Sequence, residues 1–363
     1  MHLDKYLQDL EDRIDEAVEE ELLASWKEFT EDRFQGEVFV PARRKAAAPK
    51  VAWPKVLIND AIEDCELMAL AQFADCSRML EKAAGSVMMV RSDYGTSILP
   101  SLFGVRLFLM ERDLDTLPTS IPLQNLDAIR RLIERGAPDL HQSLGARTFE
   151  MGKRFMAIKE RYPRIGKYVQ VYHPDLQGAM DICEVIWGSR LFTDVIEHPD
   201  LVKRFLDLVC ETYIAFLREW HRIVPAPAEG CGFHWGTFHK GRIMLRTDSA
   251  MNFSPRMFDE FIRPYEQRLL DAFGGGAIHF CGRGDHYIES LCAMRGVSGI
   301  AMSQPHLNDM EVICRNTIDN GIKLLDFAPD QAAKALAAGR KLRGQVHCWS
   351  KPELQNNTLK SAR

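Results

Sequence analysis

The sequence lacks any uninterrupted apolar run long enough to span a bilayer, so we expect no transmembrane helix and no membrane partner. Its first residues, Met1 to Tyr6, lack the basic region and apolar stretch of a signal peptide, and we therefore expect a cytoplasmic protein. Positive charge is not in excess either. The formal net charge is −5, which argues against nucleic acid as a partner. No repeat at solenoid periods occurs in the chain.

Cysteines are few and irregularly spaced. The nine cysteines are an odd number in a chain of 363 residues, a pattern that does not indicate a disulfide framework. In a reducing compartment most are expected to be small buried residues, which leaves one or two as candidate ligands or nucleophiles. Those in helical patterns are expected to pack: Cys65, Cys76, Cys210, Cys292 and Cys314. Apolar residues make up 46% of the chain, enough for a large core.

Hydrophobic periodicity predicts an α/β protein. Residues 3–29 read as one amphipathic helix, and residues 35–55 as irregular chain. Thereafter short apolar runs alternate with helical patterns, as expected for parallel strands joined by helices. The predicted strands are Val56–Ile58, Ser86–Ser92, Lys167–Tyr172, Arg242–Thr247, Ala277–Cys281, Ser298–Met302, Ile322–Phe327 and Gly344–Cys348. Eight such strands favour a closed (β/α)8 TIM barrel over residues 56–363, preceded by an N-terminal helical extension over 1–55.

Two helices have clear signals. One follows Pro199 and has an apolar face. The other begins at Ser254 and Pro255, the favoured N-cap and first-turn pair, and is interrupted by Pro264. Residues 93–124, rich in Gly and Pro, are expected to form an irregular excursion over the mouth of the barrel.

The strand that contains His279 and Cys281 is the most informative segment. Side chains alternate along a strand, so Ala277, His279 and Cys281 share one face, while the apolar Ile278 and Phe280 share the other. We expect the apolar pair to face the helices and the His-x-Cys pair to point inward. Glycine follows Cys281 at once, which places the pair at the carboxyl end of the strand, where barrel enzymes carry their active sites. Imidazole and thiolate both bind zinc, although a core histidine beside a buried cysteine is the alternative.

The last predicted strand offers a third ligand. Only one of His347 and Cys348 can point inward, and we favour Cys348 because Val346 shares its face and suits the interior. His234 and His239, in a loop rich in Gly and aromatic residues, are the next candidates for a ligand and also for substrate binding. A simple loop is the alternative there.

Three further polar residues are candidates for the site. Arg246 and Asp248 share one face at the end of the strand over 242–247. Asp248 is a candidate catalytic group that orients a ligand histidine or binds substrate, and Arg246 is a candidate for substrate binding. The alternative is a salt bridge at the rim of the barrel. Tyr94 follows the strand over 86–92 and is expected to reach the substrate, unless it only forms a turn.

Several motifs resemble those of the uroporphyrinogen decarboxylase-like superfamily, which also contains zinc methyltransferases that act with corrinoid proteins. The resemblance spans roughly residues 86–350 and is carried by the segments 175–181, 191–194, 198–202, 248–258, 261–265 and 279–282. The methyltransferase branch holds zinc with a His-x-Cys pair and a distant cysteine, which implies His279, Cys281 and Cys348, the last after 66 intervening residues. The decarboxylase branch has an Arg-rich N-terminal motif that Arg43, Arg44 and Lys45 do not reproduce.

Three functions are thus open. The first is zinc-dependent methyl transfer from a corrinoid donor, either free or carried by a corrinoid protein, to a small thiol. The physical reason is that a free thiol is mostly protonated at neutral pH, whereas zinc drives off its proton. The second is a metal-free decarboxylase or lyase with His279 and Asp248 as acid–base groups. The third is a protein that binds a corrinoid or tetrapyrrole without turnover.

Overall fold

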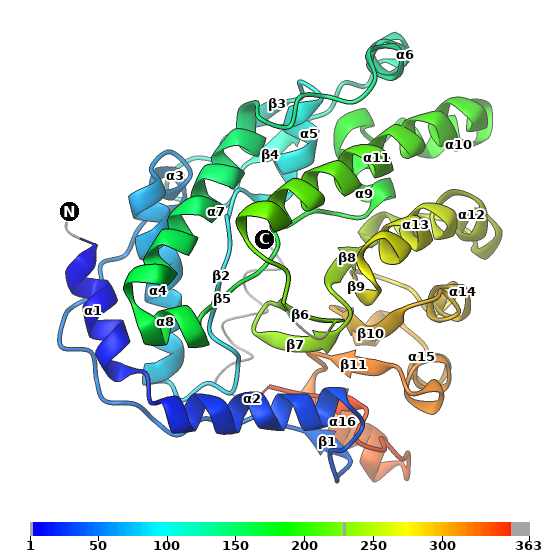
Figure 1. Ribbon diagram of the computed structural model, residues 1–363. Helices are drawn as coiled ribbons and strands as arrows, with labels where there is room; N and C mark the ends of the chain where they lie inside the picture. Colours follow the sequence, from blue (N-terminus) through cyan, green and yellow to red (C-terminus); the bar gives the residue numbers. More distant parts are fainter. Residues whose placement is uncertain (1–2, 228–229, 350–363) are drawn as a thin grey trace.

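The computed structural model describes residues 3–227 and 230–349, and it shows a mixed α/β protein with parallel strands at the centre and helices around them (Figure 1). A six-stranded parallel sheet has the order β1-β12-β11-β10-β9-β8, and a two-stranded parallel sheet pairs β2 with β5. These strands are β1 Val38–Phe39, β2 Met89–Val90, β5 Gln170–Val171, β8 Ile243–Arg246, β9 Gly276–Phe280, β10 Val297–Met302, β11 Lys323–Leu325 and β12 Val346–His347.

Two antiparallel hairpins supplement these sheets. One pairs β3 (Arg106–Phe108) with β4 (Thr119–Ile121), inside the segment expected to be irregular. The other pairs β6 (Cys231–His234) with β7 (Thr237–Lys240). The second hairpin is tied to the parallel strands, since Gly236 accepts a hydrogen bond from the Val87 N–H.

Sixteen α-helices lie within the described residues, most of them between successive strands. They are α1 Asp4–Arg13, α2 Glu16–Thr30, α3 Ile58–Ala61, α4 Cys65–Glu81, α5 Ile98–Leu102, α6 Leu126–Arg135, α7 Ser143–Arg161, α8 Pro163–Tyr168, α9 Ala179–Trp187, α10 Leu191–Glu197, α11 Pro199–Ile223, α12 Pro255–Phe261, α13 Arg263–Phe273, α14 Ile288–Cys292, α15 Met310–Asn316 and α16 Pro329–Ala337. None of them is long and apolar enough to cross a membrane.

The N-terminal region differs from the prediction in two ways. The expected single helix is two helices, because Asp15 caps α2 by accepting the N–H groups of Ala17 and Val18. The predicted strand Val56–Ile58 is wrong, since α3 begins at Ile58. The strand that the prediction missed is β1, which lies in the segment read as irregular and pairs with β12.

Side-chain alternation divides the core into two clusters. Met89, Met244, Ala277, Ala301 and Leu325 form an inner cluster with aromatic residues of α2 and β7. Their strand neighbours, such as Leu245, Ile278 and Phe280, belong to the main cluster that packs against the helices. The faces predicted for Ala277, Ile278 and Phe280 are therefore correct.

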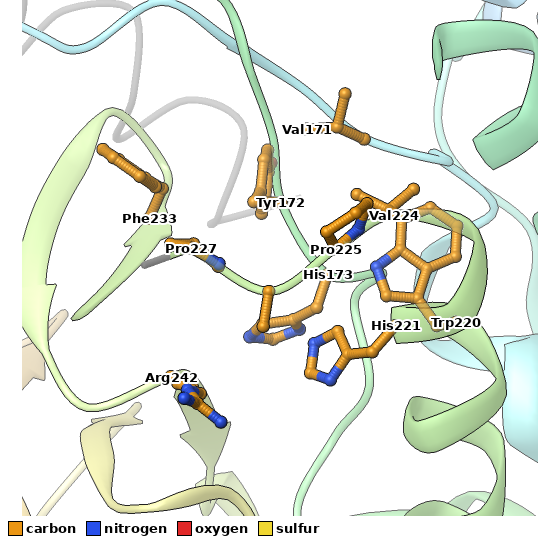
Figure 2. A pocket seen from close by; sticks show the side chains of 11 residues that line it. Val171, Tyr172, His173, Trp220, His221, Val224, Pro225, Pro227, Phe233 and Arg242 are labelled. Carbon is orange, nitrogen blue, oxygen red and sulfur yellow. The ribbon is translucent and has the colours of Figure 1, made fainter. Parts of the chain in front are cut away.

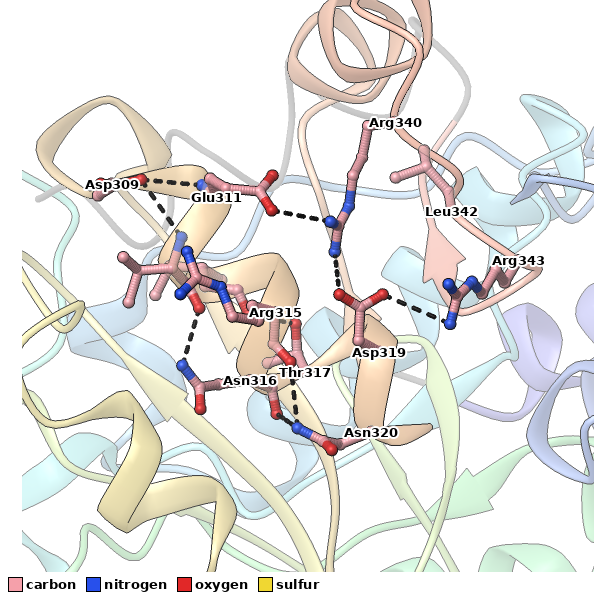
Figure 3. Close-up of polar contacts among 12 residues, drawn as sticks. Asp309, Glu311, Arg315, Asn316, Thr317, Asp319, Asn320, Arg340, Leu342 and Arg343 are labelled. Atoms are coloured by element: carbon pink, nitrogen blue, oxygen red, sulfur yellow. Dashed lines mark hydrogen bonds and ion pairs between the residues drawn. The ribbon is translucent and has the colours of Figure 1, made fainter.

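A surface ion-pair network joins the elements near the end of the described chain (Figure 3). Arg340, after α16, contacts Glu311 of α15 at 2.9 Å and Asp319 at 2.8 Å, and Arg343 contacts Asp319 at 3.5 Å. Glu311 is exposed, so its pair with Arg340 contributes at most about 1 kcal/mol. The network ties the start of α15 to the segment after α16.

Candidate metal centre

Three ligand-type side chains meet at the carboxyl ends of β8 and β9. Arg246, the last residue of β8, is in register with His279 of β9, so Asp248 and Cys281 emerge beside each other two residues later. One ligand atom each of Asp248, His279 and Cys281 lies within 4.8 Å of the other two. His279 Nε2 is 3.4 Å from Cys281 Sγ and 3.8 Å from Asp248 Oδ1. These three side chains, here called the metal group, are of types that bind metal ions and form a candidate metal site.

The protonation states of this group suit metal binding. Burial lowers the pKa of His279 to about 4, so its imidazole is neutral at pH 7 and can offer a lone pair. Burial, followed by the negative charge of Asp248, raises the pKa of Cys281 to about 11. Its thiol therefore keeps its proton at neutral pH in the absence of a cation and is 3.5 Å from the Ser303 hydroxyl oxygen. The side chain of Asp248 is 37% exposed, which leaves the group open to solvent on that side.

The loop after Cys281 is held in one conformation by hydrogen bonds. Gly282 has a φ of +75°, and a Cβ there would lie 2.6 Å from the Met251 sulfur, so the position requires glycine. The Gly282 N–H donates to Gln304 Oε1 at 2.6 Å, while Asn308 Oδ1 accepts the N–H groups of Gly284 and Asp285. The sequence patterns did not identify Gln304 or Asn308, because both act through backbone contacts far along the chain.

A buried carboxylate lies beneath Asp248. Asp181 of α9 accepts the Asp248 N–H at 2.9 Å and the Ser249 N–H at 2.8 Å. Burial, followed by the charge of Asp248, raises the pKa of Asp181 above its usual range. Asp248 Oδ1 in turn accepts the Cys281 N–H at 2.7 Å. Asp181 lies in the segment 175–181, which carries the superfamily resemblance. An acidic residue that follows a predicted strand is the sequence signal that could have marked it as a candidate for the site.

A second polar cluster adjoins the metal group. Arg246 and Arg91 both contact Oδ2 of Asp175, at 2.6 and 3.0 Å. The Arg246 guanidinium lies 4.1 Å from the centre of the Trp235 ring, and that ring is 5.0 Å from the ring of His279. Both guanidiniums are largely buried, with side-chain exposures of 12% and 14%. Trp235 was not singled out from the sequence, although its loop was noted for its histidines.

The two histidines of the β6–β7 hairpin are not part of the metal group. His234 is buried against the rings of Tyr172 and His173, with centroid distances of 5.0 and 4.8 Å. Neither of its ring nitrogens has a hydrogen-bond partner within residues 3–227 and 230–349, and burial lowers its pKa well below the usual value. His239 is also buried, and its Nδ1 contacts the Lys240 carbonyl at 3.2 Å.

Two other predicted residues lie away from the group. Tyr94 is 1% exposed and packs in the main core beside Cys65, so it does not extend into the site as expected. Cys348 packs with Val346 in the main cluster, against the helices. The inner face at this strand end is taken by His347, whose ring is 4.7 Å from that of Trp26, and by Trp349. The structure thus does not bring Cys348 to His279 and Cys281, and the face assigned to it was wrong.

A small pocket lies elsewhere in the molecule (Figure 2). His173, His221, Phe233 and Arg242 are among its lining residues. Arg242 precedes β8, whereas Asp248 follows it, so the pocket lies toward the opposite strand end from the metal group. It therefore adds nothing to the candidate site.

Comparisons with known proteins give the fold. No protein-family model matches the chain, and no curated protein sequence matches it. Among solved structures, the chain is similar to a methyltransferase from Methanosarcina mazei, with a TM-score of 0.56 and 16% sequence identity. The match covers 94% of this chain and 97% of that one. At this identity the likeness shows a shared fold over nearly the whole length of both chains.

Proposed function

We propose that this protein is a zinc-dependent methyltransferase that moves a methyl group from a corrinoid donor to a thiol acceptor. The observation that carries the proposal is the meeting of Asp248, His279 and Cys281 at adjacent strand ends, with their ligand atoms within 4.8 Å of one another. The sequence resemblance to zinc methyltransferases and the fold shared with a protein named methyltransferase support it. Imidazole, thiolate and carboxylate are the ligands that zinc takes in proteins.

The proposed ligand set differs from the one expected from the sequence. Asp248 takes the place of Cys348, because Asp248 Oδ1 lies 3.8 Å from His279 Nε2 and Cys348 faces the helices. With zinc bound by three side chains, a fourth position would admit a substrate thiol and lower its pKa. A neutral His279 and two anionic ligands balance the charge of a divalent cation, so the complex is neutral before substrate binds.

The chain's own residues then have separate tasks. The zinc ion would be held by His279, Cys281 and Asp248. The Arg246–Trp235 stack forms the adjoining wall, where we propose that the remainder of the substrate binds. A methylcorrinoid donor would supply the methyl group: its cobalt–carbon bond would break with the electron pair left on cobalt, a sulfur–carbon bond would form, and the thiol proton would be released. The resemblance to corrinoid-dependent enzymes is the support for that donor.

We also propose that the two parallel sheets belong to one eight-stranded barrel. Two hydrogen bonds support a link between the segment after β5 and strand β8: the Met244 N–H donates to His173 Nε2 at 3.1 Å, and the Gly178 N–H donates to the Arg246 carbonyl at 2.8 Å. Between β1 and β2, Arg43 donates to the Ser86 carbonyl at 2.9 Å. In such a barrel the metal group lies at the carboxyl-end face, where barrel enzymes carry out their chemistry.

The test combines metal content with turnover. Protein purified without chelator should hold about one zinc per chain, bound by the proposed site of Asp248, His279 and Cys281. With cobalt(II) in place of zinc, the correct thiol should change the ligand-field spectrum, and methylcobalamin should methylate that thiol. His279→Ala should abolish both, whereas the exposed His141→Ala should change neither. Absence of metal binding, with CO2 release from a carboxylated substrate, would overturn the proposal in favour of a decarboxylase.

A further inference from the structure

The turn that carries Asp248 is held from below by α9. Asp181, the third residue of that helix, is 3% exposed and uses both of its carboxylate oxygens on the turn. Oδ2 accepts the Asp248 N–H at 2.9 Å, and Oδ1 accepts the Ser249 N–H at 2.8 Å. Two hydrogen bonds to successive peptide groups fix the direction in which Asp248 leaves the backbone.

The local sequence lets α9 come this close. Gly178 precedes the helix, and a Cβ there would lie 2.2 Å from the Arg246 carbonyl oxygen and 2.3 Å from Glu266 Oε1. The glycine therefore permits contact between the start of α9 and the end of β8. A larger residue at this position would push Asp181 away from the turn.

Capping of α9 does not account for Asp181. Glu266, from α13, accepts the N–H of Ala179, the first residue of α9, at 3.0 Å and so satisfies a free donor of the helix terminus. Asp181 instead binds peptide groups that lie outside its own helix. A buried polar side chain is costly unless it is hydrogen-bonded, and both oxygens of Asp181 find their partners in this turn.

We propose that Asp181 is a positioning residue that sets Asp248 for metal binding. The path is short: Asp181 holds the backbone of Asp248, and Asp248 Oδ1 accepts the Cys281 N–H at 2.7 Å. One carboxylate thus orients a ligand, and that ligand orients the strand end that carries the next. The inference rests on the proposed metal site and extends it beyond the three ligands.

A double-mutant cycle tests this role. Asp181→Asn keeps the size of the side chain but puts an amide donor against one of the two N–H groups. We expect it to weaken cobalt(II) binding by about 10- to 100-fold, the range for residues that orient metal ligands, and to shift the ligand-field bands. In an Asp248→Asn background the same change should alter affinity by less than about threefold, because its effect passes through Asp248. Glu184→Gln, which loses charge next to the Ser249 hydroxyl without contacting Asp248, is the matched control.

The outcomes separate the inference from the proposed function. If wild-type protein binds no cobalt, both the proposed metal site and the positioning role are overturned. If wild-type protein binds cobalt but Asp181→Asn leaves affinity and spectrum unchanged, or weakens binding equally in both backgrounds, only the positioning role is overturned. Thermal unfolding of each variant identifies loss of fold. If Asp181→Asn does not fold, Asp181→Glu, which keeps the carboxylate but moves it by one methylene, replaces it in the cycle.

Discussion

Loading of the metal group should release one proton, and that proton should come from Cys281. Burial and the nearby charge of Asp248 raise the pKa of this thiol to about 11, whereas burial lowers the pKa of His279 to about 4. At pH 7 the imidazole is already neutral, so the thiol is the ligand that must ionise. Over a gap of four pH units, ionisation costs roughly 5 kcal/mol at about 1.4 kcal/mol per unit. The cost shrinks as the pH rises, so the zinc association constant should increase about tenfold per pH unit between pH 6 and 9.

Cys281→Ser tests this assignment. Structural zinc sites bind with roughly 10–16 kcal/mol shared among four ligands, or about 2.5–4 kcal/mol each. Loss of the thiolate should therefore weaken zinc by roughly 10²- to 10³-fold. It should also flatten the pH dependence, because a hydroxyl does not ionise in this range. Cys292→Ser is the matched control, since Cys292 ends α14 away from the metal group.

Isothermal titration calorimetry in buffers of different protonation enthalpy measures both quantities. The dependence of the observed heat on buffer gives the protons released, expected to be one for the wild type and for Cys292→Ser and near zero for Cys281→Ser. If the wild type releases no proton, the thiol is not the ionising ligand. If Cys281→Ser still releases one, the proton comes from another group, and the electrostatic reasoning is wrong in either case.

Two further predictions concern residues outside the metal group. Cys348→Ala should leave the zinc dissociation constant within about twofold of the wild type. It should lower the free energy of unfolding by about 1 kcal/mol, because a small buried side chain is lost from the main cluster. A large loss of zinc affinity would mean that the last strand turns the other way. Burial lowers the pKa of His239 to about 4, so in acid the unfolded chain takes up a proton that the folded chain does not, and stability is lost as the pH falls below about 6.5. Between pH 6 and 4.5, the free energy of unfolding of His239→Gln, measured in urea, should therefore rise relative to that of the wild type by about 1.4 kcal/mol for each unit of falling pH. A difference between the two proteins that does not change with pH would contradict this.

Local patterns predicted the elements whose residues differ between two faces. The alternation of Ala277 and His279 with Ile278 and Phe280 identified both the strand and its inner face. The same rule placed Val346 and Cys348 together on one face of β12. It gave the wrong side, because valine suits an interior and a helix-covered face equally well. Two residues of β12 are too few for a pattern to choose between them.

Local sequence patterns did not predict the contacts between segments that are far apart in the chain. Strand β1 has two residues and is defined by backbone pairing with β12, more than 300 residues later. No side-chain periodicity marks a strand so short. Asp181 and Asp248 are 67 residues apart, and only the packing of α9 against the turn after β8 shows that the Asp181 side chain accepts the Asp248 N–H. A sequence gives the candidates for such a site, whereas tertiary contacts decide which of them meet.

The exchange of a cysteine for Asp248 as the third ligand has a chemical consequence. A carboxylate carries the same charge as a thiolate, so the zinc complex stays neutral and its formation requires one fewer proton to be expelled at pH 7. Carboxylate oxygen is a harder donor than sulfur and gives less electron density to the metal. A substrate thiol bound in the fourth position should therefore ionise more readily, and its sulfur should be less nucleophilic, than in a site with two cysteine ligands. The proposed site thus favours deprotonation of the acceptor at some cost in its reactivity. A well-oriented methyl donor held in line with the sulfur is then the factor that decides the rate.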